Sequence, residues 1–176
     1  YPPGSIFKMV VAIELLERNL IDDNWQVLCK GEYEFFESTH RCTGSHGYVN
    51  LNDAMTVSCN IFFYEAVQKI RLDNLAKRSK DLFYGLPTGI DLPNEMKGRV
   101  PDRAYMNKLY GTDGWSTGAL LNISIGQGEV LVTPIQMIAY VNTIATSGNY
   151  NPIYIVKNEG VSAISTSISQ LTWKKI

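Results

Sequence analysis

Two residue types that can form a nucleophile and its base stand near the start of the chain, as Ser5 and Lys8 in the segment SIFK. The run from Met9 to Leu16 holds one polar residue, Glu14, and so predicts a buried helix that is too short to span a bilayer. Side chains three residues apart share a helix face. Burial and the helix dipole both favour the neutral amine of Lys8, which can activate a serine hydroxyl. In the alternative interpretation, Ser5 only caps the helix and Lys8 extends into solvent.

A second pair of polar residues, Ser58 and Asn60, opens another apolar run along the chain. A serine and an asparagine at this position are ordinary helix-capping residues. Together with the first motif they also form the pair Ser-x-x-Lys and Ser-x-Asn, which is typical of serine acyl-transfer enzymes. We therefore expect Ser58 and Asn60 to join Ser5 and Lys8 in one catalytic site.

Four soft ligands follow the spacing C-x12-C-x3-H-x12-C, as Cys29, Cys42, His46 and Cys59. Thiolates and imidazoles are the ligands that a structural zinc ion prefers, and a long irregular segment often needs such support. The alternatives are a disulfide between Cys29 and Cys42, with Cys59 as a buried apolar residue, or free thiols. His40 is a reserve ligand, or else an exposed loop residue.

A glycine-rich turn, Gly126-Gln127-Gly128, precedes a predicted helix. Glycines let the backbone approach a ligand closely, so these residues are candidates for a substrate-binding wall. The alternative is a simple turn before the helix. Asp91, in the segment TGIDL, is expected to have a structural role in capping a turn.

Apolar periodicity and capping residues predict the elements that position these groups. Helices are expected at 5–19, 58–70, 72–83 and 133–146, the last with Thr133 as cap and Pro134 in its first turn, and a short helical turn at 51–55 with Asn50 or Asn52 as cap. Short strands are expected within 22–48 and at 152–156, and a polar loop at 85–110. The segment 160–176 shows no pattern that assigns it.

The composition is that of an ordinary globular domain, with 176 residues, a formal net charge of −1, 45% hydrophobic and 19% charged residues. A nearly neutral charge gives no support for nucleic acid as a partner. The sequence contains no membrane-spanning run and no signal peptide. We expect an export signal or membrane anchor upstream of this chain.

Four segments carry a resemblance to a known family: YPPGSIFK, GSHGYVNLNDAMTVSCNIFFYEA, GLPTGIDLPNE and ISIGQGEVLVTPIQM. They resemble the transpeptidase domain of class B penicillin-binding proteins, and most of all its elongation-type members. The resemblance covers residues 1–158 and leaves 159–176 as a tail of unclear structure. It implies an α/β (α+β) fold shared with serine β-lactamases, in which an antiparallel sheet packs on a helical subdomain.

The resemblance also implies a reaction, the D,D-transpeptidation that cross-links peptidoglycan stem peptides without a catalytic cofactor. Ser5 would attack the D-Ala-D-Ala bond, Lys8 would take its proton, Ser58 would relay that proton to the leaving amine, and Asn60 would bind Lys8 and the substrate amide. β-Lactams would acylate Ser5. Some elongation-type members carry zinc near this place, and His46 and Cys59 match two of their ligands.

The third signature of the family, Lys-Thr-Gly or Lys-Ser-Gly, is missing from the sequence. We therefore expect an incomplete domain that is mainly the helical subdomain, with an apolar face left exposed where the sheet would pack. Competing functions are a β-lactamase or β-lactam sensor, and a catalytically inactive fragment stabilised by zinc. The resemblance further implies an extracytoplasmic, periplasmic location, an inner-membrane anchor outside this chain, and proteins of the cell-wall elongation complex as partners.

Overall fold

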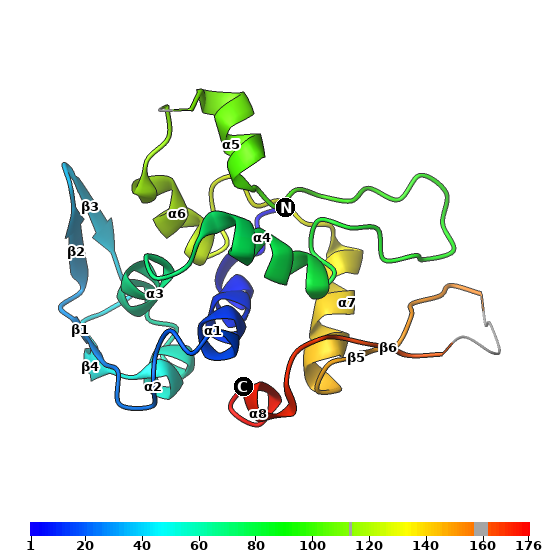
Figure 1. Cartoon of the computed structure of the whole chain (residues 1–176), viewed down its shortest axis with the longest axis horizontal. Helices are drawn as coiled ribbons and strands as arrows, with labels where there is room; N and C mark the ends of the chain where they lie inside the picture. The colour runs from blue at the N-terminus through cyan, green and yellow to red at the C-terminus, as the bar shows by residue number, and fades with distance from the viewer. Residues whose placement is uncertain (113, 157–161) are drawn as a thin grey trace.

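The central element is helix α1 (Lys8–Glu17), which follows a 3-10 turn at Gly4–Phe7 (Figure 1). The computed structural model describes residues 1–112, 114–156 and 162–176. Every residue of α1 from Val10 to Leu15 is buried, as the apolar run predicts. The one acidic residue among them, Glu14, accepts a hydrogen bond at 3.0 Å from Arg78 and another from Arg18. These contacts allow a carboxylate to be buried in an apolar helix.

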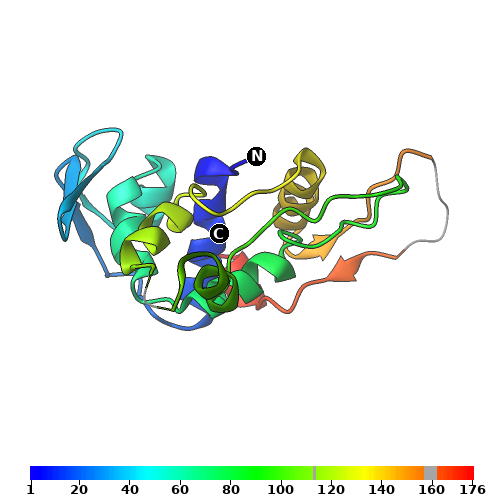
Figure 2. The same cartoon turned by 90° about the horizontal axis from the view of Figure 1, so that it is seen from above.

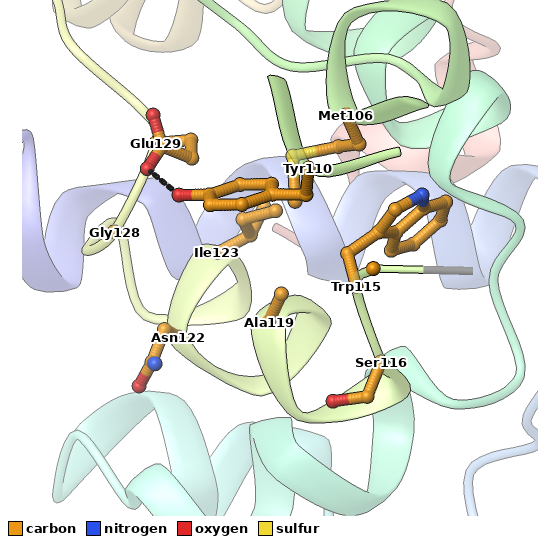
Figure 3. A pocket seen from close by; sticks show the side chains of 10 residues that line it. Met106, Tyr110, Trp115, Ser116, Ala119, Asn122, Ile123, Gly128 and Glu129 are labelled. Atoms are coloured by element: carbon orange, nitrogen blue, oxygen red, sulfur yellow. Dashed lines mark hydrogen bonds between the residues drawn. The ribbon is translucent and has the colours of Figure 1, made fainter. Parts of the chain in front are cut away.

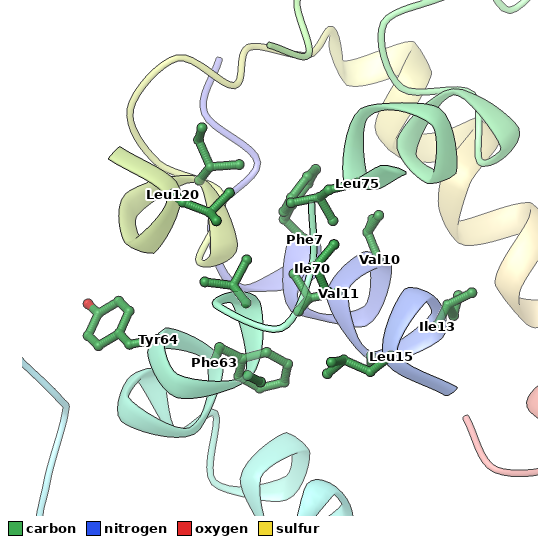
Figure 4. Packing of buried hydrophobic residues seen from close by; sticks show 14 of the residues in the cluster. Phe7, Val10, Val11, Ile13, Leu15, Phe63, Tyr64, Ile70, Leu75 and Leu120 are labelled. Atoms are coloured by element: carbon green, nitrogen blue, oxygen red, sulfur yellow. The ribbon is translucent and has the colours of Figure 1, made fainter. Parts of the chain in front are cut away.

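The other helices surround α1. They are α2 (Leu51–Thr56), α3 (Asn60–Val67), α4 (Leu72–Asp81), α5 (Arg103–Tyr110), α6 (Thr117–Ser124), α7 (Pro134–Ala145) and α8 (Gln170–Trp173). Helices α3 and α4 contact α1 directly. Their buried side chains form one core with α1, which includes Phe7, Val11, Phe63 and Leu75 (Figure 4).

The strands form three antiparallel pairs: β1 (Val27–Cys29) with β4 (Gly47–Val49), β2 (Glu32–Phe35) with β3 (Ser38–Arg41), and β5 (Asn149–Tyr150) with β6 (Ile164–Ser165). In the register of the first pair, Cys29 lies opposite Gly47. The first four strands lie at one end of the molecule and β5–β6 at the other, as Figure 2 shows. The fold is thus a mixed α/β fold with mostly helices and short strands, as expected.

Capping explains where two of the correctly predicted helices, α2 and α7, begin. Asn50 accepts a hydrogen bond from Asp53 N at 2.9 Å, within a capping box, and so starts α2. Thr133 and Gln136 form a second capping box at α7, and Pro134 is the first helical residue. Helix α3 begins later than predicted, at Asn60 instead of Ser58, because Ser58 has a left-handed backbone (φ 52°) that cannot continue a helix.

Two predicted elements are wrong. Residues 103–110 of the predicted loop form α5, whose N-terminus is capped by Asp102 through Tyr105 N at 2.8 Å. The predicted strand at 152–156 does not form; instead, the Asp91 carboxylate accepts the backbone N–H groups of Ile155 and Val156 at 2.7 and 2.9 Å. Asp91 therefore has a structural role, as expected, but through these bonds it holds a distant segment. The N–H groups of Ile155 and Val156 bind this side chain and not the backbone of a neighbouring strand.

The C-terminal segment contributes β6 and α8, which the sequence pattern did not assign. Ser169 caps α8, and Glu17 of α1 accepts hydrogen bonds from the hydroxyls of Ser169 and Thr172 at 2.7 and 2.6 Å. The expected domain boundary after residue 158 lies outside the described residues.

One face of α7 is apolar and uncovered. Ile138 and Val141 are 53% and 54% exposed, and they border a shallow depression with Met137 and Asn142. This agrees with the exposed apolar face expected beside a missing sheet. In the described part of the chain, no helix combines the length and the apolar character needed to cross a membrane.

Candidate active site and metal centre

The ammonium group of Lys8 lies at the centre of the candidate site. Lys8 is the first residue of α1 and is 1% exposed. Its Nζ lies 2.6 Å from Ser58 O, 2.8 Å from Ser58 Oγ and 2.7 Å from Asn60 Oδ1. Residues about fifty positions apart in the chain are thus brought together, as the two motifs predict.

Local backbone geometry aims these partners at Lys8. Ser58 occupies a left-handed conformation, which is uncommon for residues other than glycine and is often found at functional sites. Asn60 Nδ2 donates a hydrogen bond to the carbonyl of Arg41 at 3.2 Å. Because the amide nitrogen is held there, the amide oxygen faces Lys8. Arg41 takes part through a backbone carbonyl, which no sequence motif reveals.

Burial lowers the pKa of Lys8, while negative charge on the sulfurs of Cys42 and Cys59, when present, acts in the opposite direction; the net effect is a lowered pKa. The three contacts suit the neutral amine as well as the ammonium. A neutral amine has two N–H donors, for Ser58 O and Asn60 Oδ1, and one lone pair that can accept the proton of Ser58 Oγ. The geometry is therefore that of a lysine that can exchange a proton with Ser58.

Ser5 lies in the 3-10 turn that leads into α1, and its side chain is exposed. Its carbonyl accepts the backbone N–H of Lys8. In the described part of the structure, the Ser5 hydroxyl makes no hydrogen bond, and the bonds of Lys8 go to Ser58 and Asn60. Ser5 is thus accessible at the turn directly before the lysine, with no hydrogen bond between the two side chains in this part of the structure.

The Gly126-Gln127-Gly128 turn supports the turn that carries Ser5. Gly126 O accepts the N–H of Gly4 at 3.0 Å, and Gly126 has φ 70°. A Cβ on Gly126 would overlap the backbone of Gly4, so only glycine fits there. Gln127 is exposed, and its N–H donates to Asn122 O at 2.9 Å. Substrate binding by these three residues stays a prediction.

Gly128 also borders a cavity of about 360 Å³ between α5 and α6 (Figure 3). Its walls include Met106, Tyr110 and Trp115, and the Tyr110 hydroxyl donates to Glu129 at 2.6 Å. Sequence analysis missed this cavity, because α5 was predicted as loop and α6 was not predicted.

The four predicted metal ligands form one cluster. The ligand atoms of Cys29, Cys42, His46 and Cys59 all lie within 4.8 Å of one another. His46 Nδ1 lies 3.4 Å from Cys29 Sγ and 3.6 Å from Cys42 Sγ, and Cys42 Sγ lies 3.9 Å from Cys59 Sγ. The three cysteines are free, so the alternative of a Cys29–Cys42 disulfide is not seen. His40 lies outside the cluster, with its ring 5.3 Å from that of Tyr64.

The cluster has the chemistry and spacing for a metal ion. Three sulfurs and one imidazole nitrogen are the ligands that tetrahedral zinc prefers, and separations of roughly 3.4–3.9 Å suit neighbours on one such ion. Burial acts to raise the pKa of the Cys42 thiol, but hydrogen bonds from the N–H groups of Ile61, Asn60 and Gly44 and from Cys29 outweigh this effect and lower the pKa to about 6. A thiolate, the form that binds metals, is thus favoured at Cys42. The cluster could therefore bind a metal.

The cluster also touches the candidate active site. Cys42 Sγ accepts the backbone N–H of Asn60 at 3.2 Å, and Cys59 lies between Ser58 and Asn60 in the chain. Cys59 Sγ caps α3 by accepting Phe62 N at 3.5 Å. A metal held here would therefore fix the same backbone that presents Ser58 and Asn60 to Lys8.

Comparison with known proteins gives consistent matches. The penicillin binding protein transpeptidase domain family matches residues 1–175, which includes the segment after residue 158. The chain is 31% identical over 162 residues to peptidoglycan D,D-transpeptidase MrdA of Haemophilus influenzae, covering 89% of this chain and 25% of that protein. It is 32% identical over 141 residues to MrdA of Escherichia coli, covering 78% of this chain and 22% of that protein.

Among solved structures, the complex between penicillin-binding protein PBP2 and MreC from Helicobacter pylori matches with a TM-score of 0.90 and 32% identity. The match covers 99% of this chain and 33% of that chain. The chain thus spans about a quarter to a third of the length of these relatives. It belongs to the penicillin-binding protein transpeptidase family and is related to the elongation-type PBP2/MrdA enzymes.

Proposed function

We propose that the chain carries the nucleophile half of a peptidoglycan D,D-transpeptidase. The observation that carries this proposal is the buried Lys8, with its Nζ within 2.8 Å of both Ser58 Oγ and Asn60 Oδ1. An amine whose pKa is lowered by burial is suited to proton transfer at neutral pH. Ser5, exposed at the turn just before Lys8, is the nucleophile.

In the first step, Ser5 Oγ attacks the carbonyl carbon of the D-Ala-D-Ala bond and its proton passes to the neutral amine of Lys8. The C–N bond breaks, and the leaving amine receives a proton through the Ser58 hydroxyl, which lies 2.8 Å from Lys8. An ester on Ser5 remains. In the second step, the amine of a neighbouring stem peptide attacks this ester, a new C–N bond forms and the C–O bond to Ser5 breaks. The attacking amine loses a proton to Lys8, and Lys8 returns a proton to Ser5 Oγ.

Asn60 keeps the site ordered in both steps. Its amide oxygen binds Lys8 at 2.7 Å, and its amide nitrogen is held by Arg41 O at 3.2 Å. The exposed Gln127 and its glycine neighbours are the proposed wall for the substrate. β-Lactams resemble the D-Ala-D-Ala dipeptide and would acylate Ser5 to a slowly hydrolysed ester.

Zinc is the metal that we propose for the cluster of Cys29, Cys42, His46 and Cys59. It would supply folding energy and hold the start of α3, and it would take no part in bond making or breaking. We further propose an extracytoplasmic location, with anchoring outside this chain and cell-wall elongation proteins as partners. The relationship to MrdA and to a PBP2 that binds MreC supports both.

Acylation by fluorescent penicillin tests the function. The sequence holds no Lys-Thr-Gly or Lys-Ser-Gly, the segment that supplies an oxyanion donor in the family, and loss of one such donor costs on the order of a hundredfold in rate. We expect the 176-residue chain to label weakly or not at all. A version extended with that segment of a relative should label strongly on Ser5.

Ser5→Ala in the extended version is the control, and peptide mapping identifies the acylated residue. Equal labelling of Ser5→Ala and its parent would falsify the assignment of the nucleophile. The lifetime of the adduct separates the competing functions. Release within seconds indicates a β-lactamase, whereas no labelling of either version indicates an inactive fragment.

A further inference from the structure

The turn that carries Ser5 is anchored by a hydroxyl from a distant helix. Tyr140 of α7 donates a hydrogen bond from its hydroxyl to the carbonyl of Ile6, the residue after Ser5, at 2.8 Å. Tyr140 is 2% exposed, so without this bond its hydroxyl would be a buried polar group with no partner, which is costly. The Ser5 side chain itself makes no hydrogen bond within the described part of the chain, so its position follows from its backbone.

Aromatic stacking holds the Tyr140 ring in place. Its ring stacks on that of Tyr84, with centroids 4.5 Å apart, and Tyr84 stacks on Phe7 at 6.1 Å. Phe7 belongs to the same turn as Ile6. This row of stacked rings therefore contacts the turn at two points. One is the Phe7 ring, and the other is the Ile6 carbonyl, which Tyr140 binds.

The two tyrosines differ in one respect. Burial raises the pKa of both hydroxyls, so both stay protonated. Tyr140 uses its proton to bind Ile6, whereas the Tyr84 hydroxyl, also buried, has no partner among the described residues. Tyr84 thus contributes its ring alone to the stack and offers a matched comparison for the Tyr140 hydroxyl.

We propose that Tyr140 is a positioning residue for the nucleophile, acting through its hydroxyl on the backbone carbonyl of Ile6. It keeps the turn closed, so that Ser5 stays at a fixed place relative to Lys8 and Ser58. The proposal rests on the proposed function in so far as Ser5 is the nucleophile. The anchoring itself is a property of the chain that can be measured without activity.

Hydrogen exchange of the 176-residue chain tests the anchoring. The backbone N–H of Lys8 donates to Ser5 O, so its exchange reports opening of the turn. In Tyr140→Phe we expect its exchange to become about tenfold faster, equivalent to roughly 1.4 kcal/mol. In Tyr84→Phe it should be unchanged. The amide of Leu75, buried in α4, should be unaffected in both variants.

Equal acceleration of exchange at Lys8 and Leu75 in Tyr140→Phe means a general loss of stability and overturns the proposal, as does no acceleration at Lys8.

The extended version then tests the catalytic consequence. Tyr140→Phe should slow acylation of Ser5 by about tenfold with unchanged affinity for penicillin before the covalent step, and Tyr84→Phe should match the parent. If the parent itself is not acylated, the proposed function fails while the exchange result still decides the anchoring.

Discussion

Ser58 combines a strained backbone with a hydroxyl that faces Lys8. Its φ of 52° places it in the left-handed region, which disfavours residues with a Cβ by about 1–2 kcal/mol relative to glycine. The conformation turns both its carbonyl and its hydroxyl toward Lys8 Nζ, at 2.6 and 2.8 Å. The strain is thus tied to the contact that would relay the proton, a pattern found at functional sites.

Substitution of Ser58 by glycine and by alanine separates strain from the lost hydroxyl. Both variants lose the contact between the Ser58 hydroxyl and Lys8 and keep the carbonyl contact, but only alanine keeps the strained Cβ. We expect Ser58→Gly to be more stable than Ser58→Ala by about 1 kcal/mol in chemical unfolding.

Val57, with φ −94°, is the control position, where glycine should be less stable than alanine by about 0.5–1 kcal/mol. The same order of stability at both positions would contradict the presence of strain at Ser58. In the extended version, both Ser58 variants should acylate Ser5 more slowly than the parent, because both lack the relay hydroxyl.

Residue types predicted the polar side chains at the centre of the site, but not the backbone groups and the tyrosine that hold them in place. Lys8, Ser58 and Asn60 were found because they meet through their side chains, so their types and spacing carry a signal. The carbonyls of Arg41 and Ile6 contribute through the backbone, where any residue would serve. The role of the Tyr140 hydroxyl depends on which carbonyl α7 faces, which only the packing of α7 beside the N-terminal turn determines.

The segment from β1 to the start of α3 has little apolar core of its own. Its ligand cluster brings the strands and the start of α3 together. Cys29 ends β1, Cys42 follows β3, His46 precedes β4 and Cys59 caps α3. One ion bound to all four would join these elements at a single point. Because Cys42 Sγ also accepts Asn60 N–H at 3.2 Å, one hydrogen bond would link a metal bound here to Asn60, the proposed catalytic asparagine.

We predict about one equivalent of zinc per chain in protein purified without added metal, measured by elemental analysis. Removal with a strong chelator should lower the unfolding temperature and shift the amide resonance of Asn60, because its acceptor Cys42 is released. Cys59→Ser should lower the zinc content, whereas His40→Ala, outside the cluster, should leave it unchanged. A zinc content below about half an equivalent, with all three thiols titrating as free, would rule the zinc site out.

Helices and strands were predictable where their limits are set by local contacts. Helices α2 and α7 begin at capping boxes, Asn50 with Asp53 and Thr133 with Gln136, which depend on residues three apart. The expected strand at 152–156 failed because its N–H groups are taken by Asp91, more than sixty positions earlier. The four-residue helix α8 depends likewise on Glu17 of α1, which binds its first turn. Such long-range partners leave no periodic pattern in the sequence.

The exposed face of α7 is the clearest sign of how this chain relates to larger relatives. Ile138 and Val141 are each more than half exposed, whereas Ala139, Tyr140 and Thr143 of the same helix are buried. Such a stripe is typical of a helix that packs on another layer. The chain covers 33% of the solved PBP2 chain, and we expect that a sheet would pack on this face of α7 in an extended protein.

Substitution of Ile138 by serine tests this relationship. In the 176-residue chain the side chain is 53% exposed, so Ile138→Ser should change the free energy of unfolding by less than about 0.5 kcal/mol. In the extended version, where a sheet would cover α7, the same change should destabilise by about 1–3 kcal/mol. Phe36 is the control: it is 84% exposed, between β2 and β3 at the far end from α7, so Phe36→Ser should have a small effect in both versions. Equal effects of Ile138→Ser in the two versions would mean that the added segment does not pack on α7, and that this face has another use.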